Sequence, residues 1–251
     1  MSEDFTHRFT GRASDYSMHR PEYPRQILDI LKTECGFDQD KTVADIGSGT
    51  GLLSRLFLQN GNKVFCVEPN DEMRSFAEQG LSSFPNFVSI KGRAEDTTLK
   101  DSSIDLVTVG QALHWFDFQL AKKGFERILR NNRDVCIVYN DRSEKDPFMK
   151  EYDSLVRRHA RDRAKVPEVN NAFLSSWFRD GMFKKFNLSN EQFLDRQGLA
   201  GRIMSASYMP NSSEKEKFTA LKNDISNLFE SHAEKGKVRM LYETRVFIGK
   251  I

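Results

Sequence analysis

Three glycines at alternate positions, directly after a short apolar segment, predict a turn that could bind a nucleotide. Residues 47–51 read Gly-Ser-Gly-Thr-Gly and follow the apolar residues 43–46. Glycine has no Cβ atom, so the backbone of such a turn can approach a ligand closely and adopt left-handed φ angles. A second apolar segment, residues 63–67, ends at Glu68, whose carboxylate could accept hydrogen bonds from ribose hydroxyls.

The spacing of the glycines indicates which nucleotide is bound. The dinucleotide fingerprint G-x-G-x-x-G requires glycine where this chain has Leu52, which leaves an NAD-dependent oxidoreductase as a less favoured alternative. No Gly-Lys-Ser/Thr ending is present, so a phosphate-binding P-loop is not favoured either. Asp45 would repel a pyrophosphate but suits a ligand with an amino group and a positive charge. S-adenosylmethionine has both.

The segment Asp45-Ile-Gly-Ser-Gly-Thr-Gly51 resembles motif I of the class I (Rossmann-like) S-adenosylmethionine-dependent methyltransferases, whose pattern is acidic-x-Gly-x-Gly-x-Gly. The resemblance implies S-adenosylmethionine as the cofactor and methyl transfer as the activity. In this part of the chain we predict cofactor contacts from Asp45, Gly47, Ser48, Gly49, Gly51, Glu68, Pro69 and Met73.

Two later loops add to the resemblance. The segment 92–96 follows the apolar residues 87–90 and resembles the adenine-binding loop of the family, with Ala94 and Glu95 in contact with the base. The segment 111–117, Gln-Ala-Leu-His-Trp-Phe-Asp, resembles the motif after the fourth strand in the type 11 group that includes trans-aconitate and related small-acid methyltransferases. Further cofactor contacts are predicted from Gln111, Ala112 and Trp115.

The absence of an Asp/Asn-Pro-Pro motif at 111–117 argues against methylation of a nucleic-acid base.

Near the N-terminus, residues 16–24 resemble a segment that closes over the cofactor in small-molecule methyltransferases. We predict that Tyr16 and Arg20 contact the cofactor and that Tyr23 contacts the substrate. The alternative is an arm that packs its aromatic rings on the core.

The chemistry of the acceptor decides which other residues are needed. A hydroxyl or amine acceptor must lose a proton, and His114 is the candidate base because histidine titrates near pH 6.5. A carboxylate acceptor needs no base but does need cations, for which Arg20 and Arg142 are candidates. Tyr208 lies in a segment that resembles the substrate pocket of the same group. The alternatives are a histidine that contacts the cofactor or packs beside Trp115, and arginines that lie on the surface.

Apolar segments that alternate with helical patterns predict an α/β fold, a Rossmann-like doubly wound sheet of seven strands. By resemblance, the sheet is mostly parallel with an antiparallel last strand. We expect residues 1–140 to form the cofactor-binding core with an N-terminal lid. Residues 141–210 would form a helical cap that binds the substrate, and residues 211–251 a helix and the last strands of the core sheet.

Composition limits the partners. With 38 basic and 36 acidic residues the net charge is +2, which favours a small-molecule substrate over nucleic acid or a membrane. Three widely spaced cysteines without a C-x-x-C pair predict no metal site and fit a reducing cytoplasm. We expect a monomer or a homodimer. The second hypothesis is a regulatory protein that binds S-adenosylmethionine without turnover.

Overall fold

The computed structural model describes residues 20–161, 169–206 and 208–251, so the predicted contact from Tyr16 lies outside the described residues. The strands within these segments are β1 Val43–Ile46, β2 Val64–Val67, β3 Phe87–Ile90, β4 Ile104–Gly110, β5 Leu129–Arg142, β6 Phe183–Leu194 and β7 Val238–Lys250. The α-helices are α2 Gln26–Cys35, α3 Leu52–Gln59, α4 Asp71–Leu81, α5 Phe118–Ile128, α6 Pro147–His159, α7 Asn171–Trp177, α8 Arg196–Met204 and α9 Lys215–His232. Two 3₁₀ turns, η2 Leu113–Trp115 and η3 Arg179–Gly181, complete the described elements.

The strands form one sheet in the order β3-β2-β1-β4-β5-β7-β6. The first five run parallel, and β7 runs antiparallel to both β5 and β6. The prediction of a seven-stranded, mostly parallel sheet with an antiparallel last strand is confirmed. The chain moves outward in one direction from β1 to β3 and in the other from β4 to β5. Such a reversal opens a crevice at the carboxyl ends of β1 and β4, where open α/β sheets bind ligands.

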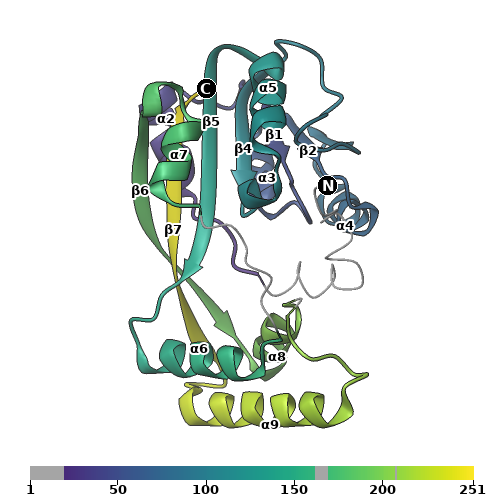
Figure 1. Ribbon diagram of the computed structural model, residues 1–251, viewed down its shortest axis with the longest axis vertical. Helices are drawn as coiled ribbons and strands as arrows, with labels where there is room; N and C mark the ends of the chain where they lie inside the picture. Colours follow the sequence, from purple (N-terminus) through teal and green to yellow (C-terminus); the bar gives the residue numbers. More distant parts are fainter. Residues whose placement is uncertain (1–19, 162–168, 207) are drawn as a thin grey trace.

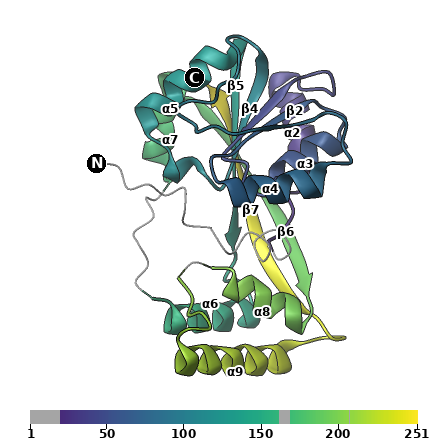
Figure 2. The same cartoon turned by 90° about the vertical axis from the view of Figure 1, so that its right-hand side faces the viewer.

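Helices cover both faces of the parallel part (Figures 1 and 2). Helices α5 and α7 pack on one face, around Phe125 and Trp177, and α2, α3 and α4 pack on the other, around Phe57 and Leu81. All four residues of β1 are buried, as expected for a strand covered on both faces. The apolar segments of the sequence therefore form the five parallel strands, of which β3 is at the edge of the sheet, and their carboxyl ends all lie on one side.

A third core lies at one end of the molecule. Strands β5, β7 and β6 have 14, 13 and 12 residues, against 4 in β1, and they extend beyond the parallel part of the sheet. Helices α6, α8 and α9 pack around their far ends and form a separate layer, which we call the helical layer (Figure 1). Tyr152, Leu199 and Leu221 are buried in it.

The structure differs here from the expected division of the chain. Residues 141–210 are not purely helical, because residues 183–194 form the edge strand β6. Along β6, half-buried and exposed residues alternate, which is the period of a strand. Helix α9, which we expected to complete the core of the sheet, packs instead on α6 and α8. The cap is therefore built by chain segments on both sides of β6.

Packing of the loop after α7 on β7 generates a stability prediction. A Cβ atom at Gly249 would lie 2.5 Å from Phe178 Cδ1 and 2.8 Å from the Met182 carbonyl oxygen. Gly249→Ala should lower the free energy of unfolding by about 1–3 kcal/mol, because the added methyl group would overpack the site. The control is Gly80→Ala within α4, where the nearest atom is Arg55 Nη2 at 3.6 Å. The control should be neutral or stabilising by up to about 1 kcal/mol.

Urea denaturation of the two glycine variants measures this difference. Equal stabilities would contradict the packing described for β7.

Candidate cofactor and active site

The glycine turn between β1 and α3 is held between two other parts of the fold. Gly47 has a φ of +67°, and a Cβ atom there would lie 2.8 Å from Ala112 Cβ in the loop after β4. Gly51 has a φ of +80°, and a Cβ atom there would lie 2.5 Å from Leu81 Cδ1 of α4. Both positions therefore require glycine, for backbone conformation and for space. The predicted residues 47–51 and Ala112 do come together.

Asp45 lies directly beneath the turn. Its Oδ2 accepts a hydrogen bond from Ser54 Oγ at 2.5 Å, and its Oδ1 accepts one from Thr108 Oγ1 at 3.0 Å. Burial raises the pKa of Asp45 to about 6, although the two hydroxyl groups act in the opposite direction. The carboxylate thus ties β1, α3 and β4 together. Because both oxygens already accept hydrogen bonds within the protein, its direct contact with a cofactor stays a prediction.

Glu68 connects the turn with the start of α4. Its Oε2 accepts a hydrogen bond from the Gly49 N–H, and its Oε1 accepts one from the Asn70 N–H, both at 2.9 Å. Asn70 in turn caps α4 by accepting from the Met73 N–H at 2.9 Å. Burial raises the pKa of Glu68, and the two backbone donors oppose this. Pro69, between Glu68 and the cap, is half-buried. A carboxylate thus lies at the carboxyl ends of β1 and β2, as predicted.

Two hydroxyl groups of the turn lack partners. Ser48 Oγ and Thr50 Oγ1 are buried, and neither has a hydrogen-bond partner within the described parts of the chain. Buried polar atoms are nearly always hydrogen-bonded, so such atoms point to a ligand. Residues 45–53 contain no lysine or arginine. Backbone amides, hydroxyls and carboxylates without a basic side chain fit an adenosyl ligand with an amino group better than a pyrophosphate.

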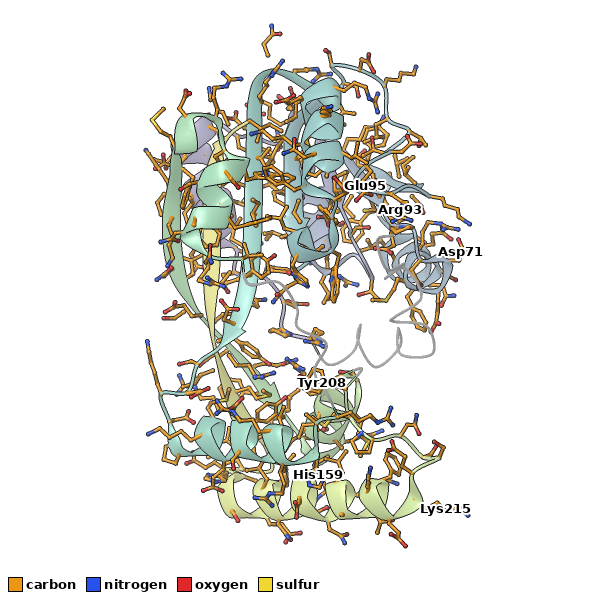
Figure 3. The ribbon with its side chains drawn as sticks, in the orientation of Figure 1. Asp71, Arg93, Glu95, His159, Tyr208 and Lys215 are labelled. Atoms are coloured by element: carbon orange, nitrogen blue, oxygen red, sulfur yellow. The ribbon has the colours of Figure 1, made fainter. Side chains whose placement is uncertain are left out.

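The loop after β3 is tied to the start of α5. Glu95 Oε1 accepts a hydrogen bond from the Asp117 N–H at 2.8 Å, and Glu95 Oε2 lies 3.5 Å from Arg93 Nε (Figure 3). Ala94 is buried, and its carbonyl oxygen lies 3.0 Å from where a Cβ of Gly124 would be. The loop is thereby fixed at the ligand-binding edge of the sheet. Its contact with adenine stays a prediction.

The loop after β4 contacts the end of β5. Gln111 Nε2 donates to the Asn140 carbonyl oxygen at 2.8 Å. His114 Nδ1 lies 3.3 Å from the Tyr139 hydroxyl, and the ring centroids of His114 and Trp115 are 4.4 Å apart. Burial raises the pKa of Tyr139, which keeps its hydroxyl protonated at neutral pH. The structure therefore brings the predicted base beside a phenol that the sequence analysis did not select.

The remaining predicted residues lie near the carboxyl ends of β4 and β5. The Tyr23 hydroxyl lies 2.9 Å from where a Cβ of Gly110 would be, at the end of β4. Tyr23 and Arg20 help to line a cavity of about 540 Å³ that begins beside Leu52, the first residue of α3. Arg142 and Tyr208 are hydrogen-bonded to each other beyond the end of β5. Tyr208 lies on the side of the helical layer that faces the sheet (Figure 3).

Some site residues were missed by the sequence analysis. Ser54 and Thr108 are recognisable only once the elements that bear them are packed together. Tyr139 and Asn140 could have been selected, because they end the fifth apolar segment and so lie at the ligand-binding edge.

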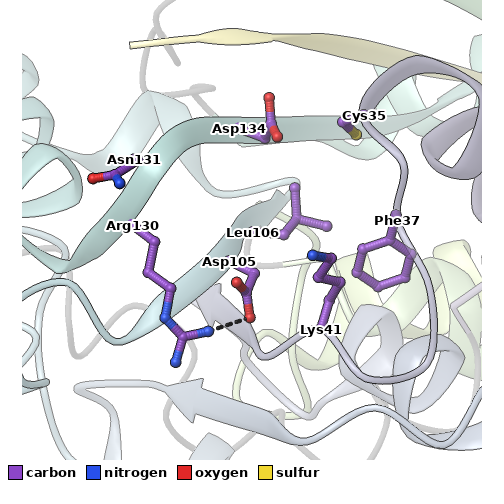
Figure 4. A pocket seen from close by; sticks show the side chains of 8 residues that line it. All are labelled: Cys35, Phe37, Lys41, Asp105, Leu106, Arg130, Asn131 and Asp134. Carbon is purple, nitrogen blue, oxygen red and sulfur yellow. Dashed lines mark hydrogen bonds and ion pairs between the residues drawn. The ribbon is translucent and has the colours of Figure 1, made fainter.

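A smaller cavity, of about 200 Å³, lies at the opposite edge of the sheet (Figure 4). It lies at the amino ends of the strands, with Leu106 of β4 and the ion pair between Arg130 and Asp105 at 2.6 Å in its wall. Ligands of open α/β sheets bind at the carboxyl ends of the strands. We therefore do not assign the cofactor to this cavity.

Comparisons with known proteins agree with the geometry of the turn. Residues 44–137 match the family described as methyltransferase domain. An uncharacterised methyltransferase-like protein of Schizosaccharomyces pombe is 26% identical over 242 residues, which are 95% of this chain and 93% of that protein. An uncharacterised methyltransferase of Mycobacterium bovis is 32% identical over 168 residues, 66% of each chain.

Solved structures agree on the fold. A structure from Anaeromyxobacter dehalogenans, described only provisionally as a type II methyltransferase, has a TM-score of 0.69 at 19% identity and covers 92% of this chain and 97% of that one. A Haemonchus contortus N-methyltransferase has a TM-score of 0.56 at 15% identity, over 100% of this chain and 60% of that one. The chain thus has the class I methyltransferase fold, and residues 44–137 match the methyltransferase domain family. The matches support S-adenosylmethionine-dependent methyl transfer.

The described residues contain neither a cluster of metal ligands nor a membrane-spanning helix. No group of three or more His, Cys, Asp or Glu among them could hold a metal ion. None of the helices that they form is both long enough and apolar enough to cross a membrane.

The buried carboxylate of Asp45 generates a prediction about pH. Its pKa of about 6 in the folded protein exceeds the ordinary 3.8, so the stability that it contributes is complete below pH 3.8 and is lost as the pH rises through 6. Asp45→Asn keeps a donor and an acceptor for Ser54 and Thr108 but does not ionise. Between pH 4 and pH 7 the wild type should lose roughly 2–3 kcal/mol relative to the variant.

Denaturation curves of the wild type and Asp45→Asn at both pH values measure this difference. A gap between the two proteins that does not change with pH would contradict a raised pKa at Asp45.

Proposed function

We propose that the chain is an S-adenosylmethionine-dependent methyltransferase of a small molecule. The observation that supports this most directly is the glycine turn, where the Ser48 and Thr50 hydroxyls are unsatisfied and the carboxylates of Asp45 and Glu68 take the place of basic side chains. A cationic ligand with hydroxyl groups is complementary to such a turn. The Haemonchus contortus structure of the same fold contains S-adenosylhomocysteine, which is further support.

The residues that would hold the cofactor follow from the edge of the sheet. Each oxygen of Glu68 accepts one backbone N–H and keeps a second lone pair, with which it would accept hydrogen bonds from the ribose. The turn 47–51 would face the amino-acid part, and Ala94 with Glu95 would face the adenine. When bound, S-adenosylmethionine supplies a methyl group on a positively charged sulfur atom. The chain's own contribution is to hold the acceptor in line and exclude water. Positioning of this kind is worth roughly 7–11 kcal/mol.

For the acceptor we propose a carboxylate or a hydroxyl, in the type 11 group related to trans-aconitate and small-acid methyltransferases. A hydroxyl acceptor needs a base, and His114 is the candidate because it lies at the end of β4, beside β5. The Tyr139 hydroxyl would orient the imidazole through Nδ1 and leave Nε2 for the acceptor. A carboxylate acceptor is already ionised at neutral pH and would leave the histidine only a positioning role.

Turnover separates an enzyme from a regulatory protein that only binds the cofactor. The assay uses S-adenosylmethionine with a labelled methyl group and a panel of small carboxylic and hydroxy acids. Label in the acceptor, together with formation of S-adenosylhomocysteine, would support the proposal. Tight binding of S-adenosylhomocysteine without label in any acceptor would favour the regulatory protein.

His114→Ala tests the base with the best acceptor from that panel. If the acceptor is a hydroxyl, kcat should fall by roughly 10²–10⁴-fold, because general-base assistance is lost. In His114→Ala the pH profile should then lack the acidic limb that reports deprotonation of the base in the wild type. An unaltered pH profile would rule out the base role. A second variant, Tyr139→Phe, removes the hydroxyl that orients His114 but leaves the imidazole, so it should lower kcat less than His114→Ala and keep the acidic limb.

A further inference from the structure

Arg202 in α8 is a buried guanidinium with few partners. The residue is 3% exposed. Within the described parts of the chain its one hydrogen bond runs from Nε to the Tyr242 hydroxyl at 3.3 Å, and it makes no ion pair there. The two terminal nitrogens provide four more N–H donors in a fork that matches an oxyanion. A buried charge without a counter-ion is costly, so a partner for this fork is expected.

A second arginine lies beside the first. Arg142 ends β5 and is paired across the sheet with Tyr242, the residue that accepts from Arg202. Arg142 hydrogen-bonds Tyr208, and its guanidinium lies 5.4 Å from the ring centroid of Tyr152. The charges of both arginines act on Tyr208, and so does that of Arg20. We call Arg142, Arg202, Tyr152, Tyr208 and Tyr242 the arginine group.

The arginine group has an excess of positive charge. The one ion pair that its two arginines make among the described residues joins Arg142 Nη2 and Asp153 Oδ1 at 3.6 Å. Asp153 is shared with the exposed Arg157, whose Nε lies 2.5 Å from Asp153 Oδ2. Burial alone would raise the pKa of Tyr208, but its hydrogen bond with Arg142 and the nearby positive charges lower the pKa below its ordinary value. The surroundings of Tyr208 therefore favour an anion.

The arginine group lies at a distance from the methyl-transfer edge that suits a small substrate. Tyr139, which contacts His114, and Arg142 are three residues apart on β5. At about 3.3 Å per residue in a strand, the two residues are roughly 10 Å apart along β5, and the odd spacing directs their side chains to opposite faces of the strand. Tyr208, which interacts with Arg142, lies on the face of the helical layer toward the sheet (Figure 3). Arg20, whose charge acts on Tyr208, also lines the cavity that begins beside Leu52, so a small acid in that cavity could reach the arginine group from the cofactor edge.

We propose that the arginine group is the acceptor-binding subsite, in which the forks of Arg142 and Arg202 bind a carboxylate or phosphate group of a small acidic acceptor. This inference rests on the proposed function, because the acceptor's other end must reach the transferable methyl group. It adds a binding residue, Arg202, and restricts the substrate class to small anions. The helical layer then serves to exclude water from an ion pair with the substrate, which strengthens that pair.

The test uses the full chain saturated with S-adenosylhomocysteine and measures calorimetric titrations with succinate, citrate, glycerol 3-phosphate and inorganic phosphate. Succinamide, which is neutral and similar in shape to succinate, is the ligand control. Arg202→Met keeps the length of the side chain without its charge, and Arg142→Gln changes a less buried position. Arg196→Gln, an exposed position on the same helix that pairs with Glu230 at 3.0 Å, is the matched protein control.

At least one of the four anions should bind the wild type, and succinamide should not. The affinity for the anion that binds should fall at least tenfold in Arg142→Gln and in Arg202→Met, and by no more than twofold in Arg196→Gln. Arg202→Met should also be as stable as the wild type when no oxyanion is present, since it removes a buried charge. If Arg202→Met fails to fold, Arg142→Gln alone decides the outcome.

Each contrary result has a distinct meaning. If S-adenosylhomocysteine does not bind, the proposed function fails before the arginine group is tested. If it binds but none of the anions does, or if the variants bind them as tightly as the wild type, the proposed subsite is wrong and the methyltransferase assignment stands. Binding of phosphate compounds alone, or of carboxylates alone, supports the subsite and identifies the acid.

Discussion

The buried carboxylate of Asp45 is the contact on which the rest of the site depends. Its two oxygens accept hydrogen bonds from Ser54 on α3 and Thr108 on β4, so one residue of β1 fixes both neighbours of the glycine turn. Burial favours the protonated acid, and the hydrogen bonds from the two hydroxyl groups stabilise the carboxylate against this effect. With those elements fixed, Gly47 can lie against Ala112, and Glu68 can bond the Gly49 N–H.

The long antiparallel strands connect the cofactor edge with the helical layer. Strands β5 and β7 pass from the cofactor edge to the helical layer without interruption, and they bear Tyr139, Arg142 and Tyr242 in turn. A substrate site built on a continuous strand is held at a fixed distance from the cofactor edge, which positional catalysis requires. Because the helical layer has its own core, its loops can differ between relatives without disturbing the glycine turn.

Much of the parallel sheet could be predicted, because its strands are short and apolar on both faces. Residues 43–46 are the clearest case, since all four are buried. Strand β6 was missed because two of its five half-buried positions, Asn190 and Gln192, are polar, so that the alternation of apolar residues stops after Leu188. Arg202 gave no signal, since only tertiary packing decides whether an arginine on a helix is buried.

Of the candidate site, the part carried by the glycine motif could be predicted, and the contacts made by residues distant in sequence could not. Glu68 and Met73 lie beside the glycine turn, as motif and spacing indicated, and their contact with a cofactor stays a prediction. The partners of Asp45 lie 9 and 63 residues away from it in the chain, and only the packed structure brings them together. For Asp45 itself, the sequence suggested contact with the ligand, whereas the structure gives both of its oxygens partners within the protein.

Calorimetric titration of the full chain with S-adenosylhomocysteine and, separately, with NAD tests the central claim most directly. We expect S-adenosylhomocysteine to bind and NAD not to bind. Glu68→Ala should weaken that binding at least tenfold, because hydrogen bonds to a carboxylate are worth about 1.5–3 kcal/mol. Asp71→Asn, on the exposed face of the adjoining helix, should leave it unchanged. Binding of NAD without S-adenosylhomocysteine, or affinity insensitive to Glu68→Ala, would contradict the account.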